Sequence, residues 1–565
     1  MPNVIYILLR RLHTPLLLLI GVYAVSVLGF TLIPGVASGG EPYYMDFFHA
    51  FYVVSYTATT IGFGELPHPF SPAQRLWATG SIYATVVAWI YAIGSLIATF
   101  QDPAFRALIA QNRVRRAVQH MGESFYLVCG YGDTGSALVR ALTDYGLRAV
   151  VVDIDPNRVS ALELEDLRSY APGLCADAVE PQTLIEAGLQ HPRCAGVIAV
   201  TNFDMVNLQI AITAKLLRPR LRVVCRAESR DVGANMASFG TDHIINPFDI
   251  FAERLALALH APGMFLVHEW VTSVPHEPLR EPLFPPHGRW IVCGYGRFGK
   301  ALHERLAVED ISITVIEANP AGTQPPPGSV IGRGTEAHTL REAHVETAVG
   351  IVAGTDVDAN NLSIIMTARE LNPKLFMVAR QNRLTNQAIF AAADLHLTMQ
   401  RSSIIAHKIF ALIRSPLLAD FLTLAGTQTN EWANELAARI SAVTQEKAPH
   451  IWAVRLNAQD APALWQALMD GETVTLGDLF RDPHDREQTL GCIALLVKHE
   501  EKEPLLPTDD YELTAGDELL FCGRYRASQW MDWTLKNENV LKYLLHGEAP
   551  RGTASVREPA PSERM

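Results

Sequence analysis

Five residues near the N-terminus, Thr60-Ile61-Gly62-Phe63-Gly64, place two glycines directly after a threonine-rich stretch. Glycine adopts positive φ without steric cost, so alternate residues of this segment can turn successive carbonyl oxygens toward one axis. Carbonyl oxygens arranged around such an axis can replace the water shell of a cation. The predicted chemistry is therefore backbone coordination of a cation, with Thr60, Ile61, Gly62 and Phe63 as the coordinating residues.

Two motifs of the form G-x-G-x-x-G predict a second kind of chemistry, the binding of a nucleotide phosphate. Each motif follows an apolar stretch and opens an amphipathic one, and an acidic residue ends a second apolar stretch 23 residues after the first glycine. The glycines allow close backbone approach, the helix N-terminus favours phosphate, and the acid can bind a ribose diol but would repel a 2′-phosphate. The residues are Gly130, Gly132, Gly135 and Asp153 in the first copy, and Gly294, Gly296, Gly299 and Glu317 in the second.

The two copies differ in charge where a pyrophosphate would lie. The second copy has Arg297 and Arg333 at the positions that Asp133 and Asp177 occupy in the first. Because like charges repel strongly in a pocket, the second copy is predicted to be the better adenine-nucleotide site. The first copy is expected to be empty or to hold a cation such as Ca²⁺, which oxygen ligands suit. The candidate calcium ligands are Asp133, Asp153, Asp177 and Asp204.

Two uncharged apolar runs, residues 15–33 and 76–100, must position the first five-residue segment. Each is long enough for a helix that crosses a bilayer, and the first exceeds the apolar region of a signal peptide. Arg10 and Arg11 precede the first run and four arginines follow the second, so both ends are expected on the cytoplasmic side. Residues 45–57 are too short to cross but can dip into the membrane as a helix. The pattern predicts a re-entrant loop.

The rest of the chain predicts a duplicated cytosolic α/β region. The sequence YLVCGYGDTGSALVRAL at Tyr126 recurs as WIVCGYGRFGKALHERL at Trp290, and apolar strands alternate with helices throughout, which indicates mostly parallel sheets. The net charge of −12 in 565 residues argues against a nucleic-acid partner. The seven cysteines have no paired spacing, as expected for reduced cytosolic thiols.

The order of span, short helix, T-I-G-F-G, acidic residue Glu65 and second span resembles the selectivity-filter region of potassium channels. Two departures are Phe63 in place of the commoner tyrosine and Glu65 in place of the commoner aspartate. A tandem Rossmann repeat behind such a pore resembles RCK (regulator of K⁺ conductance) domains, and the whole order is similar to multi-ligand-gated bacterial channels of the GsuK type. Leu96 and Ile97 are the candidate gate residues.

The resemblance implies a homotetramer in the bacterial inner membrane, with K⁺ as the permeant ion, NAD(H) or ADP as regulatory ligand, and Ca²⁺ as a further candidate. The expected fold class is a two-span helical pore domain with a re-entrant loop, two Rossmann-like RCK domains and an α+β C-terminal lobe. The expected order is a pore domain at 1–100 (filter 60–64), a linker at 101–123, RCK1 at 124–282, the second Rossmann lobe with crossover helices at 288–430, its C-terminal lobe at 431–545 and a disordered tail at 546–565.

A membrane-tethered nicotinamide-dependent oxidoreductase is the alternative function, because dinucleotide folds often belong to dehydrogenases. The sequence supplies no substrate domain with a His and acid pair, and His338, His344 and His396 have no recognisable catalytic setting. Fold alone does not give function. We therefore expect a channel and not an enzyme.

Overall fold

The computed structural model describes residues 4–37, 40–64, 68–273, 282–444, 448–499 and 503–547. The chain forms two compact units, residues 1–117 and 118–565. Glu65 and residues 548–565 of the predicted disordered tail lie outside the described residues, and so does the stretch 274–281 between the two Rossmann copies.

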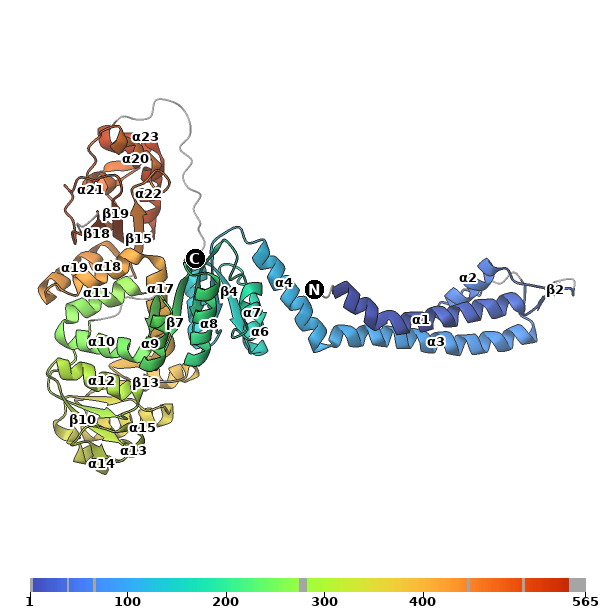
Figure 1. The fold of residues 1–565 in the computed structure, drawn as a ribbon, viewed down its shortest axis with the longest axis horizontal. Coiled ribbons are helices and arrows are strands. Elements are labelled where there is room, and N and C mark those ends of the chain that lie inside the picture. Colours follow the sequence, from blue (N-terminus) through green and yellow to red (C-terminus); the bar gives the residue numbers. More distant parts are fainter. Residues whose placement is uncertain are drawn as a thin grey trace. The chain divides into compact units, whose positions relative to one another are not determined.

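The first unit is built from two long apolar helices and a short helix between them (Figure 1). The helices are α1 (Val4–Leu32), α2 (Phe47–Ala58) and α3 (Pro72–Gln101), and the two-residue strands β1 (Gly35–Val36) and β2 (Pro42–Tyr43) pair antiparallel. Ser71 and Gln74 form a capping box that starts α3, and Trp77 Nε1 donates a hydrogen bond to Ser26 O on α1 at 3.0 Å. The Trp77 hydrogen bond holds α3 against α1.

Segments of α1 and α3 are long and apolar enough to cross a membrane, namely Arg10–Leu32 and Pro72–Gln101. In the most apolar window of each, only 22% and 17% of the residues are buried within the subunit. The core helix of a soluble protein would be mostly buried, so this exposure favours contact with lipid or with other subunits. Helix α4 (Pro103–Gln119) follows α3 along the chain.

The first Rossmann-like lobe has a six-stranded parallel sheet. Its strands are β3 (Phe125–Cys129), β4 (Arg148–Asp153), β5 (Gly173–Cys175), β6 (Cys194–Ala199), β7 (Arg222–Arg226) and β8 (His243–Ile245), and its helices are α5 (Asp133–Asp144), α6 (Pro156–Leu164), α7 (Pro181–Glu186), α8 (Asp204–Leu217) and α9 (Arg230–Ser238). The spatial order is β5-β4-β3-β6-β7-β8. The strand order therefore reverses between β3 and β6, where ligands of such sheets bind.

The second Rossmann-like lobe repeats this arrangement. Its strands are β9 (Arg289–Cys293), β10 (Ser312–Glu317), β11 (Val330–Ile331), β12 (Gly350–Ala353), β13 (Phe376–Gln381) and β14 (Leu397–Gln400), and its helices are α12 (Arg297–Val308), α13 (Pro320–Thr323), α14 (Ala337–Glu342), α15 (Asp358–Leu371) and α16 (Gln387–Ala392), with 3₁₀ turns at Val345–Thr347 and Leu384–Asn386. The order β11-β10-β9-β12-β13-β14 is parallel throughout. The predicted duplication of a parallel α/β fold is confirmed.

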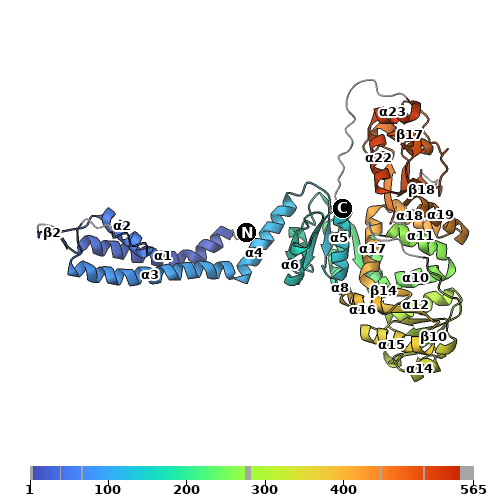
Figure 2. The same cartoon turned by 180° about the vertical axis from the view of Figure 1, so that it is seen from behind.

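Two apolar helix pairs cross between the Rossmann-like lobes. They are α10 (Pro247–His260) with α11 (Pro262–Thr272), and α17 (Arg401–Arg414) with α18 (Pro416–Ala425), each pair separated at a proline. Helix α10 lies beside α12 of the second lobe, whereas α17 lies beside α5 of the first (Figure 2). Phe251 and Leu255 of α10 pack on the second sheet, and Ile409 and Phe410 of α17 pack on the first. Each lobe thus supplies part of the other's core.

The C-terminal lobe is an α+β layer that closes on the crossover helices. Its elements are α19 (Asn430–Thr444), β15 (His450–Arg455), α20 (Pro462–Met469), α21 (Leu476–Leu479), β16 (Arg481–Asp482), β17 (Asp485–Thr489), β18 (Cys492–Lys498), β19 (Glu518–Gly523), α22 (Tyr525–Lys536) and α23 (Glu538–His546). The antiparallel order is β15-β19-β18. Apolar side chains of α11, α18 and α19 share one core with this sheet. The expected fold class is therefore confirmed.

Candidate functional site

The segment from Thr60 to Gly64 leaves α2 with positive φ at every second residue. The φ angles of Thr60, Gly62 and Gly64 are 61°, 63° and 71°. The N–H groups of Ile61 and Gly62 both donate to Tyr56 O, at 3.0 and 3.2 Å, so the end of α2 fixes the start of the segment. Alternate positive φ is the backbone pattern that the sequence predicts for carbonyls facing one axis.

The side chains of this segment lie at the surface of the single subunit. Ile61 is 59% and Phe63 is 68% exposed, and the Phe63 ring meets the Tyr56 ring edge-on at 6.3 Å between centroids. Phe63 therefore contacts an aromatic ring, but it lacks the hydroxyl group that a tyrosine at this position would carry. The candidate gate residues Leu96 and Ile97 are exposed near the end of α3. An ion pair between Arg11 and Asp102 ties α1 to the residue that caps this end.

Both glycine loops have the geometry of a dinucleotide-binding turn. The first glycines, Gly130 and Gly294, have φ of 102° and 96°, and the second glycines, Gly132 and Gly296, are the N-caps of α5 and α12. An added Cβ at Gly296 would meet nothing within 4 Å, and one at Gly132 only the Arg158 side chain. Both loops thus leave the helix N-terminus open to a ligand.

The acidic residues expected to bind ribose hold the glycine loops in place. Asp153 accepts the N–H groups of Tyr131 and Asp155, at 2.5 and 2.8 Å. Glu317 accepts those of Tyr295 and Asn319, at 2.6 and 2.7 Å. Both carboxylates are buried, at 4% and 8% exposure. A ribose could use only the lone pairs that these backbone bonds leave. Each acid therefore serves first to link the end of its own strand to the glycine loop that follows the neighbouring strand.

An asparagine in each copy links the loop before its helix to the end of the next strand by four hydrogen bonds. Asn207 accepts from the N–H and hydroxyl of Thr201 and donates to the carbonyls of Thr201 and Arg226, at 2.7 to 3.0 Å. Asn361 makes the same four bonds to Thr355 and Arg380. The asparagine of the repeated T-x-x-D-x-x-N pattern thus ties this loop to the neighbouring strand, an arrangement that we call the asparagine clasp.

We expect Asn207→Ala to destabilise the first lobe by about 3 kcal/mol, because it leaves buried backbone groups of Thr201 and Arg226 without partners. Hydrogen exchange of peptides that contain these residues should accelerate while exchange in the second lobe stays unchanged. Asn361→Ala should reverse the pattern, and Asn157→Ala, at an exposed position of α6, is the control. Local exchange at the wild-type rate in Asn207→Ala would contradict the clasp.

A cavity of about 640 Å³ lies in front of the first glycine loop. The first lobe contributes Gly132 and Thr134 from the loop and α5, and the second contributes residues from the ends of β13 and β14 and the start of α17. Its charged lining side chains are Asp133, Arg158, Glu165, Arg226 and Arg401. Three arginines against two acids at a helix N-terminus make this cavity suited to an anion.

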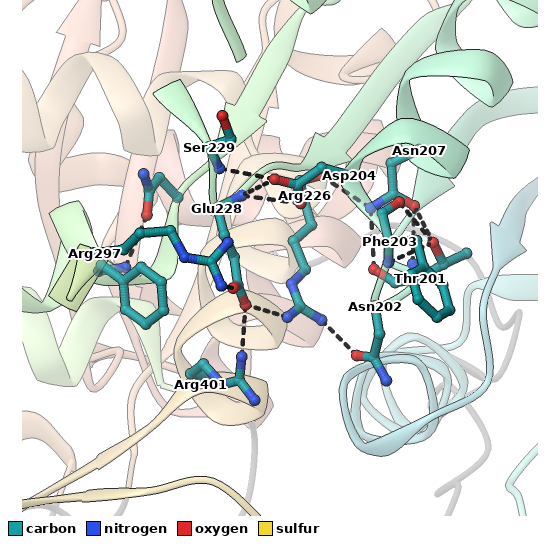
Figure 3. Close-up of polar contacts among 12 residues, drawn as sticks. Thr201, Asn202, Phe203, Asp204, Asn207, Arg226, Glu228, Ser229, Arg297 and Arg401 are labelled. Carbon is teal, nitrogen blue, oxygen red and sulfur yellow. Dashed lines mark hydrogen bonds and ion pairs between the residues drawn. The ribbon is translucent and has the colours of Figure 1, made fainter. Parts of the chain in front are cut away.

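A buried carboxylate lies behind the arginines of this cavity. Glu228 forms ion pairs with Arg226, with Arg401 at 2.7 Å and with Arg297 at 2.9 Å (Figure 3). Burial alone would raise the pKa of Glu228, but the three guanidinium groups outweigh it and hold this pKa below its ordinary value. Glu228 is therefore ionised at neutral pH.

The two arginines that were predicted to contact phosphate in the second copy lie on different elements. Arg297 starts α12, but its guanidinium pairs with Glu228 of the first lobe and lies 5.7 Å from the Phe248 ring centroid. Arg333 is exposed in the turn after β11. The nucleotide preference for the second copy stays a prediction.

The four candidate calcium ligands are engaged with separate backbone groups. Asp133 Oδ2 lies 3.4 Å from the Leu384 N–H, Asp177 accepts from Val179 N, and Asp204 accepts from the N–H groups of Glu228 and Ser229. Among the described residues, no group of three or more His, Cys, Asp or Glu side chains is arranged to hold a metal ion. The calcium site also stays a prediction.

Sequence reasoning missed Glu228, Arg158 and Arg401. A signal was available for Glu228, because the first copy reads Arg226-Ala227-Glu228 where the second reads Arg380-Gln381-Asn382. The internal repeat thus marks a carboxylate that only one copy carries. Arg401 had no comparable signal, since it reaches the first lobe through the crossover of α17.

Comparison with known proteins finds that the chain is similar to proteins named as potassium channels. Residues 126–247 and 290–400 match the TrkA-N domain. Potassium channel protein 1 of Methanocaldococcus jannaschii is 25% identical over 296 residues, which cover 51% of this chain and 84% of that protein. Probable potassium channel protein 2 of the same organism is 24% identical over 223 residues, 39% of this chain and 63% of that one.

A solved structure of the GsuK channel aligns with 94% of this chain and 99% of its own, at 16% identity and a TM-score of 0.48. The named relatives are channels rather than enzymes, which supports the expected non-enzymatic role.

Proposed function

We infer that this chain, a relative of potassium channels with two TrkA-N domains, is the subunit of a tetrameric potassium-selective channel that an adenine nucleotide gates from the cytosol. The observation that carries the inference is the alternation of positive φ at Thr60, Gly62 and Gly64, in a short segment between two candidate spans. Irregular backbone at membrane depth is tolerated where it lines a water-filled path.

Four copies around one axis would complete the ion path. One segment offers a single column of carbonyls, whereas a dehydrated K⁺ ion needs oxygen ligands on all sides. The exposed side chains of Ile61 and Phe63 and the exposed apolar face of α3 support packing against other subunits. We place the subunit in the bacterial inner membrane with both termini in the cytoplasm, as its arginines favour.

We assign the nucleotide to the cavity of the first copy, in place of the second copy that the sequence charges favour. Arg158, Arg226 and Arg401 line it, and the open N-terminus of α5 faces the same space. NAD(H) and ADP both carry the required pyrophosphate and an unphosphorylated 2′-hydroxyl. Ligand binding changes channel opening by favouring one arrangement of the Rossmann-like lobes, and residues 101–123 connect these lobes covalently to α3.

A matched pair of charge reversals tests the assignment. We expect Arg158→Glu to weaken binding of ADP and NAD⁺ to the full-length protein by about tenfold or more, because it turns an attraction to phosphate into a repulsion. Arg333→Glu, at the exposed arginine near the second glycine loop, should leave the affinity unchanged. Isothermal titration calorimetry in detergent measures both.

The opposite pattern would move the nucleotide to the second copy, as the sequence charges predict. If wild-type protein bound neither ADP nor NAD⁺, the proposed nucleotide gating would be wrong. The proposed potassium-selective pore does not depend on this result.

A further inference from the structure

Glu228 joins three arginines that come from three different elements. It follows β7 and is 7% exposed, while its partners lie at the end of β7 (Arg226), at the start of α12 (Arg297) and at the start of α17 (Arg401). Figure 3 shows the carboxylate enclosed by the three guanidinium groups. One negative charge therefore compensates three positive charges at the junction of the Rossmann-like lobes.

Two of these arginines also line the cavity of the first copy. Arg226 and Arg401 form part of its wall, and so does Asn202, whose side-chain oxygen accepts from Arg226 Nη1 at 2.9 Å. Arg226 Nε is buried and has no hydrogen-bond partner among the described residues. Because a guanidinium fork fits carboxylate and phosphate oxygens alike, Glu228 occupies groups that a phosphate in the cavity would also use.

The second copy lacks this carboxylate. Asn382 takes the place of Glu228, as both backbone N–H groups donate to the equivalent aspartates, Asp358 and Asp204. The side chain of Asn382 turns to Asp358 at 2.9 Å, and Arg380 pairs with Asp356 at 2.7 Å instead. The arrangement around Glu228 therefore distinguishes the copy to which we assign the nucleotide.

We propose that Glu228 sets the ligand affinity of the first-copy cavity by competing with the nucleotide phosphate for Arg226 and Arg401. This regulation rests on the proposed nucleotide site. A phosphate that takes over these two arginines leaves Glu228 with Arg297. Since Arg297 and Arg401 both belong to the second half of the chain, the exchange alters the ionic contacts between the lobes when the cavity fills.

The test compares Glu228→Gln with a matched control. Glu304→Gln removes another carboxylate that joins the lobes, because Glu304 on α12 pairs with Arg230 of α9 at 2.7 Å, but Glu304 is absent from the cavity wall. Titration of full-length protein with ADP and with inorganic pyrophosphate should show binding about tenfold tighter in Glu228→Gln, because the competitor and its charge are gone. The affinity of Glu304→Gln should stay at the wild-type value.

Glu228→Asp covers the case in which the neutral variant does not fold. It keeps the charge that compensates the buried arginines but shortens the side chain by one methylene, so it holds them less well and should bind pyrophosphate with an affinity between those of wild type and Glu228→Gln. If the folded variants bound ADP and pyrophosphate with wild-type or weaker affinity, the proposed competition would be wrong, while the proposed nucleotide site would still hold. Wild-type protein that binds neither probe would overturn the nucleotide site, and the competition with it.

Discussion

Alanine in place of Gly62 is expected to abolish K⁺ flux in proteoliposomes that hold the reconstituted protein. Gly62 has φ of 63°, and an L-residue with a Cβ costs about 1 to 2 kcal/mol in that region. In the proposed tetramer the cost is repeated four times around one ion path. Relief of this strain by rotation of a peptide would turn a carbonyl away from the axis and remove one ring of ligands.

Gly80→Ala provides the control for this substitution. Gly80 lies within α3, has no positive φ, and an added Cβ there meets nothing within 4 Å, so the variant should keep its flux. Gly62 also has free space around its Cβ position within the subunit, which makes φ the difference between the two sites. Wild-type K⁺ selectivity and flux in Gly62→Ala would contradict the role of residues 60–64 as the filter.

Gly135→Ala should disrupt the first glycine loop and end nucleotide binding. A Cβ at Gly135 would lie 1.9 Å from the carbonyl oxygen of Gly130, and backbone cannot move aside as a flexible side chain can. We expect a loss of about 3 kcal/mol or more in the stability of the first lobe. Hydrogen exchange over residues 126–140 and ADP titration measure the two effects.

Gly299→Ala separates the two copies, because its Cβ would lie 2.0 Å from Gly294 O in the second lobe. It should destabilise that lobe to a similar extent and leave the exchange of residues 126–140 slow. Gly132→Ala, where the atom nearest to the added Cβ is Arg158 Nη1 at 3.7 Å, should leave the loop folded. A folded first lobe that binds ADP normally in Gly135→Ala would contradict the tight approach of α5 to the glycine loop.

The local architecture could be predicted because it depends on short-range patterns. The apolar runs at 15–33 and 76–100 correspond to α1 and α3, and the short segment at 45–57 overlaps α2. Each G-x-G-x-x-G follows a strand and opens a helix, as the recurrence at Tyr126 and Trp290 indicates. Gly62 and Gly64 have the positive φ values that their spacing suggested.

The electrostatic design of the site could not be predicted, because it depends on contacts between distant parts of the chain. Arg297 was expected to face phosphate in its own copy, yet the packing of α10 and α12 brings it to Glu228. Arg401 reaches the first cavity only because α17 crosses to α5. The charged residues next to each glycine loop in the sequence therefore did not indicate which cavity arginine side chains line.

Single-channel recording from the purified protein in a planar bilayer, with unequal K⁺ and Na⁺ on the two sides, tests the central claim most directly. We predict a reversal potential close to that of K⁺ and an open probability that changes when ADP or NAD⁺ is added to the cytosolic side. A current that does not distinguish K⁺ from Na⁺, or intact tetramers that carry no current under any of these ligands, would contradict the account.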